Sequence, residues 1–142
     1  MNKVARPAVH LTDFPSQIVE RVRWNETDAF GHVNNLVFAN YCESGRVEIL
    51  REVDILGISR SVGAFIARLE IDYLAQLTWP GMVEIGTRVE AIGRTSITFK
   101  QGIFQNGICA AEAKSILVQV KDGVPEPIDD ATRAAFAKFM LS

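Results

Sequence analysis

A group of polar residues lies directly ahead of a long apolar segment, in the stretch ETDAFGHVNNLVFANYCESGR, residues 26–46. Asp28 and Glu43 carry carboxylates, which can act as nucleophiles or general bases, and His32 is of a type that often takes part in catalysis. A carboxylate beside a helix start suits the cleavage of an ester or thioester, because the unpaired N–H groups of the first helical turn stabilise the oxyanion as it forms.

A purely structural interpretation competes with this reaction site. Gly31 allows a tight turn, and Asn34 and Asn35 are natural N-cap residues. This interpretation leaves Asp28 and His32 unexplained, because both lie outside the cap yet close to it. For Asp28 the alternative is a turn or capping acid, and for His32 it is a hydrogen-bonded structural residue.

The apolar segment predicts a helix from about residue 36 to residue 53. Apolar residues recur at helical spacing and cover much of the circumference: Leu36, Phe38, Ala39, Cys42, Val47, Ile49, Leu50 and Val53. Gly45 lies on this apolar face and costs up to ~1 kcal/mol of helix propensity, so we expect a neighbouring backbone to approach it closely. The charged residues should keep the opposite side in water: Arg46, Glu48, Arg51, Glu52 and Asp54. Glu43 is then expected to form a local ion pair with Arg46.

The rest of the chain shows the alternation of strands, which we predict at residues 18–24, 65–73, 83–90, 96–105 and 108–121. Ile18, Val22 and Trp24 share one face of the first strand. Asn106-Gly107 predicts a type I′ hairpin between the last two strands. Residues 129–140 can form a short terminal helix.

This order predicts an α+β domain in which an antiparallel sheet of about five strands curls around one long central helix, with a short C-terminal helix. We expect the 142 residues to form a single domain, 1–142, in which residues 1–16 are a mobile N-terminal arm. Uncovered sheet edges favour pairing with a second subunit, and strand 65–73 is the expected partner edge.

Composition excludes several classes of protein. The chain is 48% hydrophobic and 23% charged, which is typical of a folded globular protein. With 15 Lys and Arg against 17 Asp and Glu, the net charge of -2 argues against general nucleic-acid binding. No signal peptide or membrane span is recognisable, so a cytoplasmic location is expected. Cys42 and Cys109 lack metal-binding spacing, and we interpret both as reduced core thiols.

Three stretches also resemble a known family. VRWNETDAFGHVNNLVFANYCESGR, residues 22–46, resembles the first third of the 4-hydroxybenzoyl-CoA thioesterase family of hotdog-fold acyl-CoA thioesterases. IGRTSITFKQGIFQNGICAAEAKSILVQV, residues 92–120, looks like the paired strands of that family, and PEPI, residues 125–128, is similar to its approach to the C-terminus. The string Asp-x-x-Gly-His-Val-Asn-Asn is the specific part of the resemblance.

The resemblance implies residue roles. Asp28 matches the catalytic aspartate, and the region from Asn34 to Val37 matches the helix start whose backbone N–H polarises the thioester carbonyl. His32, Asn34, Asn35 and Leu36 would therefore form the helix-start or oxyanion region. The family commonly has aspartate where this chain has Glu26. Another hotdog branch places its carboxylate within the helix, which makes Glu43 the reserve catalyst.

Acyl-CoA is the implied substrate, hydrolysed to a free acid and coenzyme A without a cofactor or metal. Arg94, Thr95 and Ser96 suit contact with coenzyme A phosphate or pantetheine, although an ordinary exposed turn explains them equally. A homodimer or homotetramer is expected. Two alternatives stay open: a non-catalytic acyl-CoA or acyl-carrier binding module, which would have no need of Asp28, and a hotdog dehydratase, which usually relies on a histidine.

Overall fold

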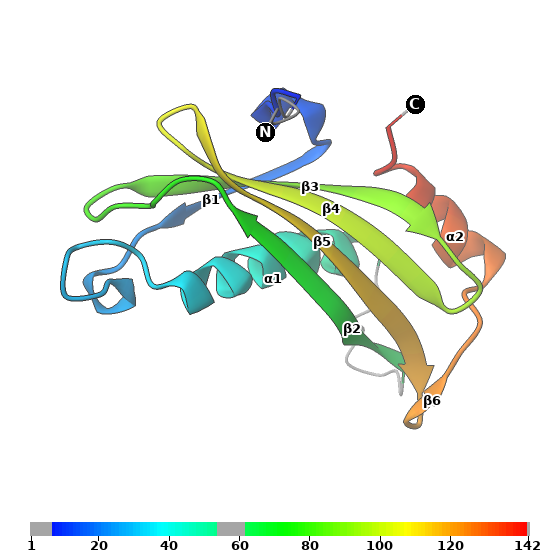
Figure 1. Cartoon of the computed structure of the whole chain (residues 1–142). Helices are drawn as coiled ribbons and strands as arrows, with labels where there is room; N and C mark the ends of the chain where they lie inside the picture. The colour runs from blue at the N-terminus through cyan, green and yellow to red at the C-terminus, as the bar shows by residue number, and fades with distance from the viewer. Residues whose placement is uncertain (1–6, 54–61, 142) are drawn as a thin grey trace, which may run out of the picture.

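The computed structural model describes residues 7–53 and 62–141. A curved antiparallel sheet holds a long helix, α1, against one face (Figure 1). The elements in chain order are η1 Leu11–Asp13, β1 Ser16–Arg21, η2 Trp24–Glu26, α1 Asn35–Glu52, β2 Val62–Tyr73, β3 Met82–Ile92, β4 Ser96–Gln105, β5 Ile108–Lys121, β6 Val124–Pro125 and α2 Asp130–Ala137. This arrangement confirms the predicted α+β architecture, with a two-residue strand added to the five expected.

The strands lie in the order β1-β3-β4-β5-β2, and β6 pairs with β5. β4 and β5 have the predicted bounds, and their hairpin is confirmed because Asn106 and Gly107 have φ angles of 52° and 78°. β2 occupies one edge of the sheet, so one side of this 12-residue strand is unpaired within the described chain. The predicted partner edge is therefore an edge strand.

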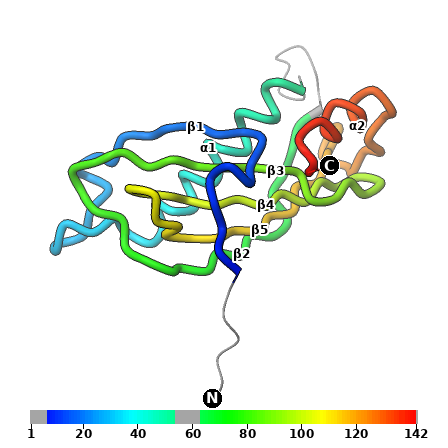
Figure 2. Tube along the Cα trace, turned by 90° about the horizontal axis from the view of Figure 1, so that it is seen from above, coloured from blue at the N-terminus to red at the C-terminus, as the bar shows by residue number. Residues whose placement is uncertain are grey.

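The N-terminal prediction needs two corrections. β1 begins at Ser16 and ends at Arg21, so Trp24 lies in the short helix η2, where its side chain is 64% exposed and not on the buried face of a strand. The expected arm through residue 16 is also too long, because Phe14 is buried and its ring contacts Phe104. This segment lies over the sheet face opposite α1 (Figure 2). Residues 1–6 lie outside the described part of the chain.

The predicted helix is confirmed as α1, and its packing explains Gly45. A Cβ atom at Gly45 would lie 2.6 Å from Thr87 Oγ1 and 2.7 Å from Gln101 Nε2. The expected close approach thus occurs, but side chains of β3 and β4 make it instead of a backbone. Leu36 and Val47 remain exposed on the outer side of α1.

One expectation about the polar face of α1 is wrong. Arg46 is buried, with 5% of its side chain exposed, and its Nη1 donates to Gln101 Oε1 over 3.3 Å. No ion pair within 4.0 Å joins Glu43 to Arg46, both of which the structure describes. The helical spacing predicted that Arg46 is exposed to water, but Arg46 packs against Gln101 of β4 and is buried there. Asp54 lies outside the described residues.

None of the described helices, the 18-residue α1 included, is long and apolar enough to cross a membrane.

Candidate active site

The polar turn ahead of α1 is closed by Asp28 itself. Asp28 Oδ1 accepts hydrogen bonds from the N–H groups of Phe30 at 2.8 Å and His32 at 3.1 Å. The Asp28 N–H donates to the His32 carbonyl over 2.7 Å, and Gly31 has the positive φ of 77° that the turn requires. One carboxylate oxygen therefore has the structural role that competes with catalysis. The other, Oδ2, has no hydrogen-bond partner within residues 7–53 and 62–141.

The start of α1 leaves one backbone donor open. Asn34 is the N-cap, as expected, and its Oδ1 accepts from the Leu36 N–H over 3.0 Å. The Val37 N–H donates to the Asn34 carbonyl over 2.9 Å. In the described chain, the N–H of Asn35 has no such partner. The predicted oxyanion region thus narrows to Asn35, because Leu36 already donates to the cap.

Asp28 and Asn35 line one cleft of about 490 Å³. The cleft is also lined by His32, Val33, Asn34, Phe38, Tyr73, Ala75 and Gln76. Tyr73 donates from its hydroxyl to the Asn35 carbonyl over 3.0 Å, and its ring centroid lies 5.0 Å from that of Phe38. The end of β2 therefore forms a wall of the cleft and fixes the first residue of α1. A carboxylate and an open backbone N–H, from two residues that line one cleft, can attack and polarise the same carbonyl group.

Glu26 holds the turn and the start of α1 in place through its hydrogen bonds, and the sequence analysis did not predict this role. Its Oε1 accepts from the Tyr41 hydroxyl at 3.0 Å and from the Arg23 N–H at 2.7 Å. Its carbonyl accepts from the N–H of the cap residue Asn34 at 2.8 Å. Burial and the bond to Glu26 raise the pKa of Tyr41 above its ordinary value, so this phenol remains a donor. The signal that could have indicated this role is that Glu26 stands where the family resembled commonly has the shorter aspartate.

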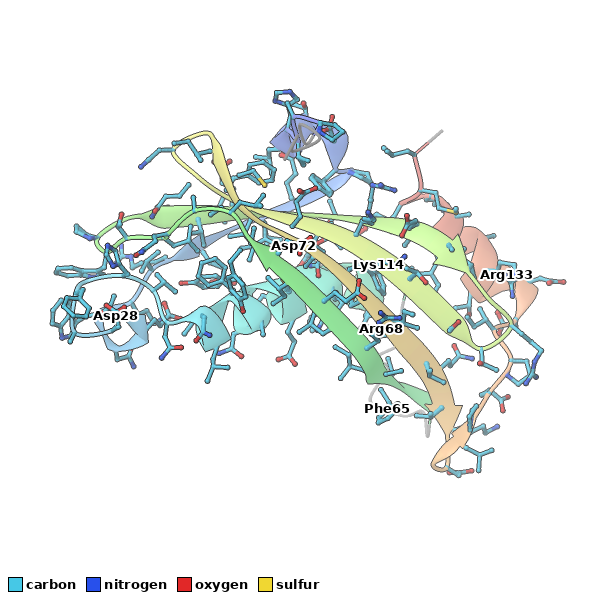
Figure 3. The ribbon with its side chains drawn as sticks, in the orientation of Figure 1. Asp28, Phe65, Arg68, Asp72, Lys114 and Arg133 are labelled. Carbon is cyan, nitrogen blue, oxygen red and sulfur yellow. The ribbon has the colours of Figure 1, made fainter. Side chains whose placement is uncertain are left out.

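The two remaining groups of predicted residues lie elsewhere. Glu43 is exposed on the outer side of α1 and lines a different groove. The turn from Arg94 to Ser96 joins β3 to β4, where Arg133 of α2 donates to the Gly93 carbonyl over 2.9 Å. Figure 3 shows Arg133 and Asp28 at opposite ends of the molecule. The structure therefore does not bring the predicted coenzyme A contacts to Asp28 of the same chain.

A metal site is not apparent in the described part of the chain, where no three His, Cys, Asp or Glu side chains come together.

Residues 22–136 match the Thioesterase-like superfamily. The chain is also 36% identical over 129 residues to the chloroplastic acyl-acyl carrier protein thioesterase ATL2 of Arabidopsis thaliana, covering 87% of this chain and 69% of that protein.

Two solved structures similar to this chain are also thioesterases or predicted thioesterases. A thioesterase of Thermus thermophilus, crystallised with coenzyme A and Zn, is 32% identical with a TM-score of 0.81, covering 89% of this chain and 95% of the other. A protein of Bacillus stearothermophilus described as a predicted thioesterase is 33% identical with a TM-score of 0.82, covering 89% and 97%. These likenesses confirm the expected hotdog fold.

Proposed function

The chain belongs to the Thioesterase-like superfamily and is a thioester hydrolase, and we propose that it cleaves acyl-CoA with Asp28 as its catalytic carboxylate. One observation carries this proposal: Asp28 and Asn35 line the same cleft, and within the described chain the Oδ2 of the first and the backbone N–H of the second have no hydrogen-bond partner. The specific string around Asp28 supports a place in the 4-hydroxybenzoyl-CoA thioesterase family.

In the proposed reaction, the thioester carbonyl oxygen accepts a hydrogen bond from the Asn35 N–H. This N–H also lies at the positive end of the α1 dipole, which favours the negative charge that develops on the oxygen. The bond is made to a backbone group held by Asn34 and Tyr73, so no reorganisation is needed as the charge develops.

Asp28 then acts through Oδ2 by one of two routes. As a general base it removes a proton from water while the water oxygen bonds to the carbonyl carbon, and the carbon–sulfur bond breaks to release the thiolate, which takes up the proton. As a nucleophile it bonds to the carbonyl carbon while the carbon–sulfur bond breaks and the thiolate leaves, and water then hydrolyses the resulting mixed anhydride to the free acid and the Asp28 carboxylate, its proton passing to the thiolate. Finding ¹⁸O in Asp28 after a single turnover in H₂¹⁸O would establish the nucleophilic route, because the general-base route never joins the water oxygen to the enzyme.

The carrier is part of the proposal. The Thermus relative was solved with coenzyme A, whereas the Arabidopsis relative is an acyl-acyl carrier protein thioesterase. We favour coenzyme A because the match to the Thermus relative covers nearly the whole of both chains. A contact from Arg94, Thr95 or Ser96 to coenzyme A at Asp28 of the same subunit is not part of this proposal, because their turn begins at Gly93, which Arg133 contacts at the end of the molecule opposite Asp28 (Figure 3).

A hydrolysis screen tests the function. Acyl-CoA substrates of increasing chain length, together with 4-hydroxybenzoyl-CoA, are assayed by release of free thiol, beside the matching acyl-carrier proteins. We expect turnover with coenzyme A substrates. Thiol release from acyl-carrier proteins alone would show that the carrier is an acyl-carrier protein and not coenzyme A. Tight binding without thiol release would favour the non-catalytic module. Hydration of an enoyl substrate without thiol release would favour the dehydratase.

We further propose that the enzyme is a homodimer formed along the free edge of β2, or a tetramer built from two such dimers. This strand ends at Tyr73, a wall of the cleft, and it exposes 59% of Phe65 and 44% of Ile66. Figure 3 shows Phe65, Arg68 and Asp72 along this edge strand. Sedimentation at micromolar concentration should give a species larger than the 15.7 kDa chain.

A further inference from the structure

Arg46 is a buried cation whose hydrogen-bond partner in the chain is neutral. Its Nη1 donates to Gln101 Oε1, and Gln101 in turn donates from Nε2 to the Cys42 carbonyl at 2.8 Å and to Thr87 Oγ1 at 2.9 Å. An amide compensates a buried guanidinium poorly, because removing a cation from water is costly unless an anion accompanies it.

Glu43, which lies one helical turn before Arg46, does not fill this role within the described chain. Glu43 acts on Arg46 electrostatically, but it is not within 4.0 Å of it and its side chain is exposed. Cys42 also faces Arg46, and burial raises the pKa of its thiol to about 11, so the thiol is neutral at physiological pH. In the described chain, Arg46 therefore lacks a paired carboxylate.

Glu43 and Arg46 both line a groove of about 360 Å³ between the outer side of α1 and the edge strand β2. The other lining residues are mostly apolar: Ala39, Asn40, Val47, Leu50, Ala64, Ile66, Leu69 and Leu117. On α1 the lining runs from Ala39 to Leu50, so its midpoint falls between Glu43 and Arg46. Glu43 and Arg46, which have no ion-pair partner in the described chain, thus lie symmetrically about the midpoint of the α1 segment that lines the groove.

We propose that a second copy of the chain covers this groove and that Glu43 of each subunit forms an ion pair with the partner subunit's Arg46. The inference rests on the proposed β2-edge dimer. In a two-fold dimer the same patch meets itself, so residues on either side of the axis exchange partners. Two antiparallel α1 helices crossing at the groove centre would bring Glu43 against Arg46 twice. The groove, its central charge pair and the unpaired edge of β2 all favour this occupant over a small ligand.

Mixing two single variants tests the pair, because it separates an inter-subunit contact from one within a chain. Homodimers of Glu43→Gln and of Arg46→Gln each lack every Glu43–Arg46 pair. Their heterodimer restores one pair, but only between subunits. With one variant fluorescently labelled, sedimentation should show heterodimers with a dissociation constant at least about tenfold below both homodimers, the scale of one close interfacial charge pair.

Two other outcomes are informative in different ways. A heterodimer no tighter than the homodimers would overturn the inter-subunit pair while leaving the dimer and the activity intact as claims. A monomeric parent protein would overturn the pair together with the β2-edge dimer, though not thioester hydrolysis.

If Arg46→Gln does not fold, the exchanged variant Glu43→Arg/Arg46→Glu keeps the test open. It should dimerise with itself and mix with the parent chain at less than about a tenth of the statistical proportion, because every mixed contact then joins like charges. Statistical mixing would overturn the proposal.

Discussion

The hydroxyl of Tyr41 donates a hydrogen bond of 3.0 Å to the carboxylate of Glu26, which joins the second turn of α1 to the polar segment that precedes it. The same Glu26 accepts at its carbonyl from the cap residue Asn34. Asp28 follows Glu26 by two residues, and Asn35 follows Asn34 directly. One acid therefore holds both proposed catalytic groups in register, although it does not itself line the cleft.

Tyr41→Phe should lower turnover without weakening substrate binding. The change removes one hydroxyl and no other atom, so Glu26 loses a part-buried partner worth about 1 kcal/mol or more. We expect kcat to fall about three- to tenfold with KM unchanged, because the acid and the N–H lose their alignment. Glu26→Gln keeps an acceptor for Tyr41 and should retain most of the activity. Equal losses in Glu26→Gln and Glu26→Ala would contradict a positioning role.

Asn35→Pro tests the backbone donor directly. Proline is tolerated at the first helical position, and Asn34, with ψ of 138°, already has the conformation that must precede it. Loss of the N–H should lower kcat by about a hundredfold or more, the scale of one oxyanion donor. Asn35→Ala keeps the N–H and should stay within about threefold of the parent. A folded proline variant with parental kcat would remove Asn35 from the mechanism.

Gly45→Ala should destabilise the protein even though alanine is the better helix former. The added Cβ would lie within 3 Å of Thr87, Gln101 and Ile85, and such overpacking costs typically about 1–3 kcal/mol against a propensity gain of up to ~1 kcal/mol. Gly63→Ala is the matched control, because no heavy atom lies within 4 Å of its Cβ position. Urea unfolding measures both. An unchanged or raised stability for Gly45→Ala would refute the close contact.

Stability should decline in alkaline solution, partly through Cys42. Burial raises the pKa of this thiol to about 11 in the folded chain, whereas the unfolded thiol ionises near ~8.5. The stabilising contribution of the protonated Cys42 thiol to the free energy of unfolding is therefore fully present below the pKa of the unfolded chain. It is lost as pH rises through the pKa of the folded chain. Cys42→Ala should flatten the fall in unfolding free energy over this range. Cys109→Ala, at a partly exposed thiol, should change it less, and equal slopes in all three proteins would contradict this account.

Local sequence signals predicted much of the fold. Alternation and Asn106-Gly107 located the β4–β5 hairpin, and helical spacing located α1, because both depend on short-range backbone chemistry. Gly45 indicated a close contact before its neighbours were known. Trp24 was misplaced because a strand and a following short helix can share the same apolar pattern.

The failures concern contacts between distant segments. Arg46 is polar by type, and only the packing of β4 beneath α1 shows that Gln101 buries it. The chemistry of Arg94 suggested contact with coenzyme A, which stays a prediction, but it could not show that the neighbouring Gly93 contacts Arg133, at the end of the molecule opposite Asp28. Periodicity contains no information on which strands become neighbours, so such relationships need the structure.

The most direct measurement compares Asp28→Asn with Glu43→Gln in steady-state hydrolysis. The amide oxygen that Asp28→Asn introduces can still accept from the N–H groups of Phe30 and His32, so the turn and the fold should persist. Without charge or basicity, we expect kcat to fall at least about a hundredfold, while a non-hydrolysable acyl-CoA analogue binds as tightly as before. Glu43→Gln should keep near-parental kcat. A folded Asp28→Asn enzyme within about threefold of the parent, beside an inactive Glu43→Gln, would transfer catalysis to the helix and leave Asp28 only its role in the turn.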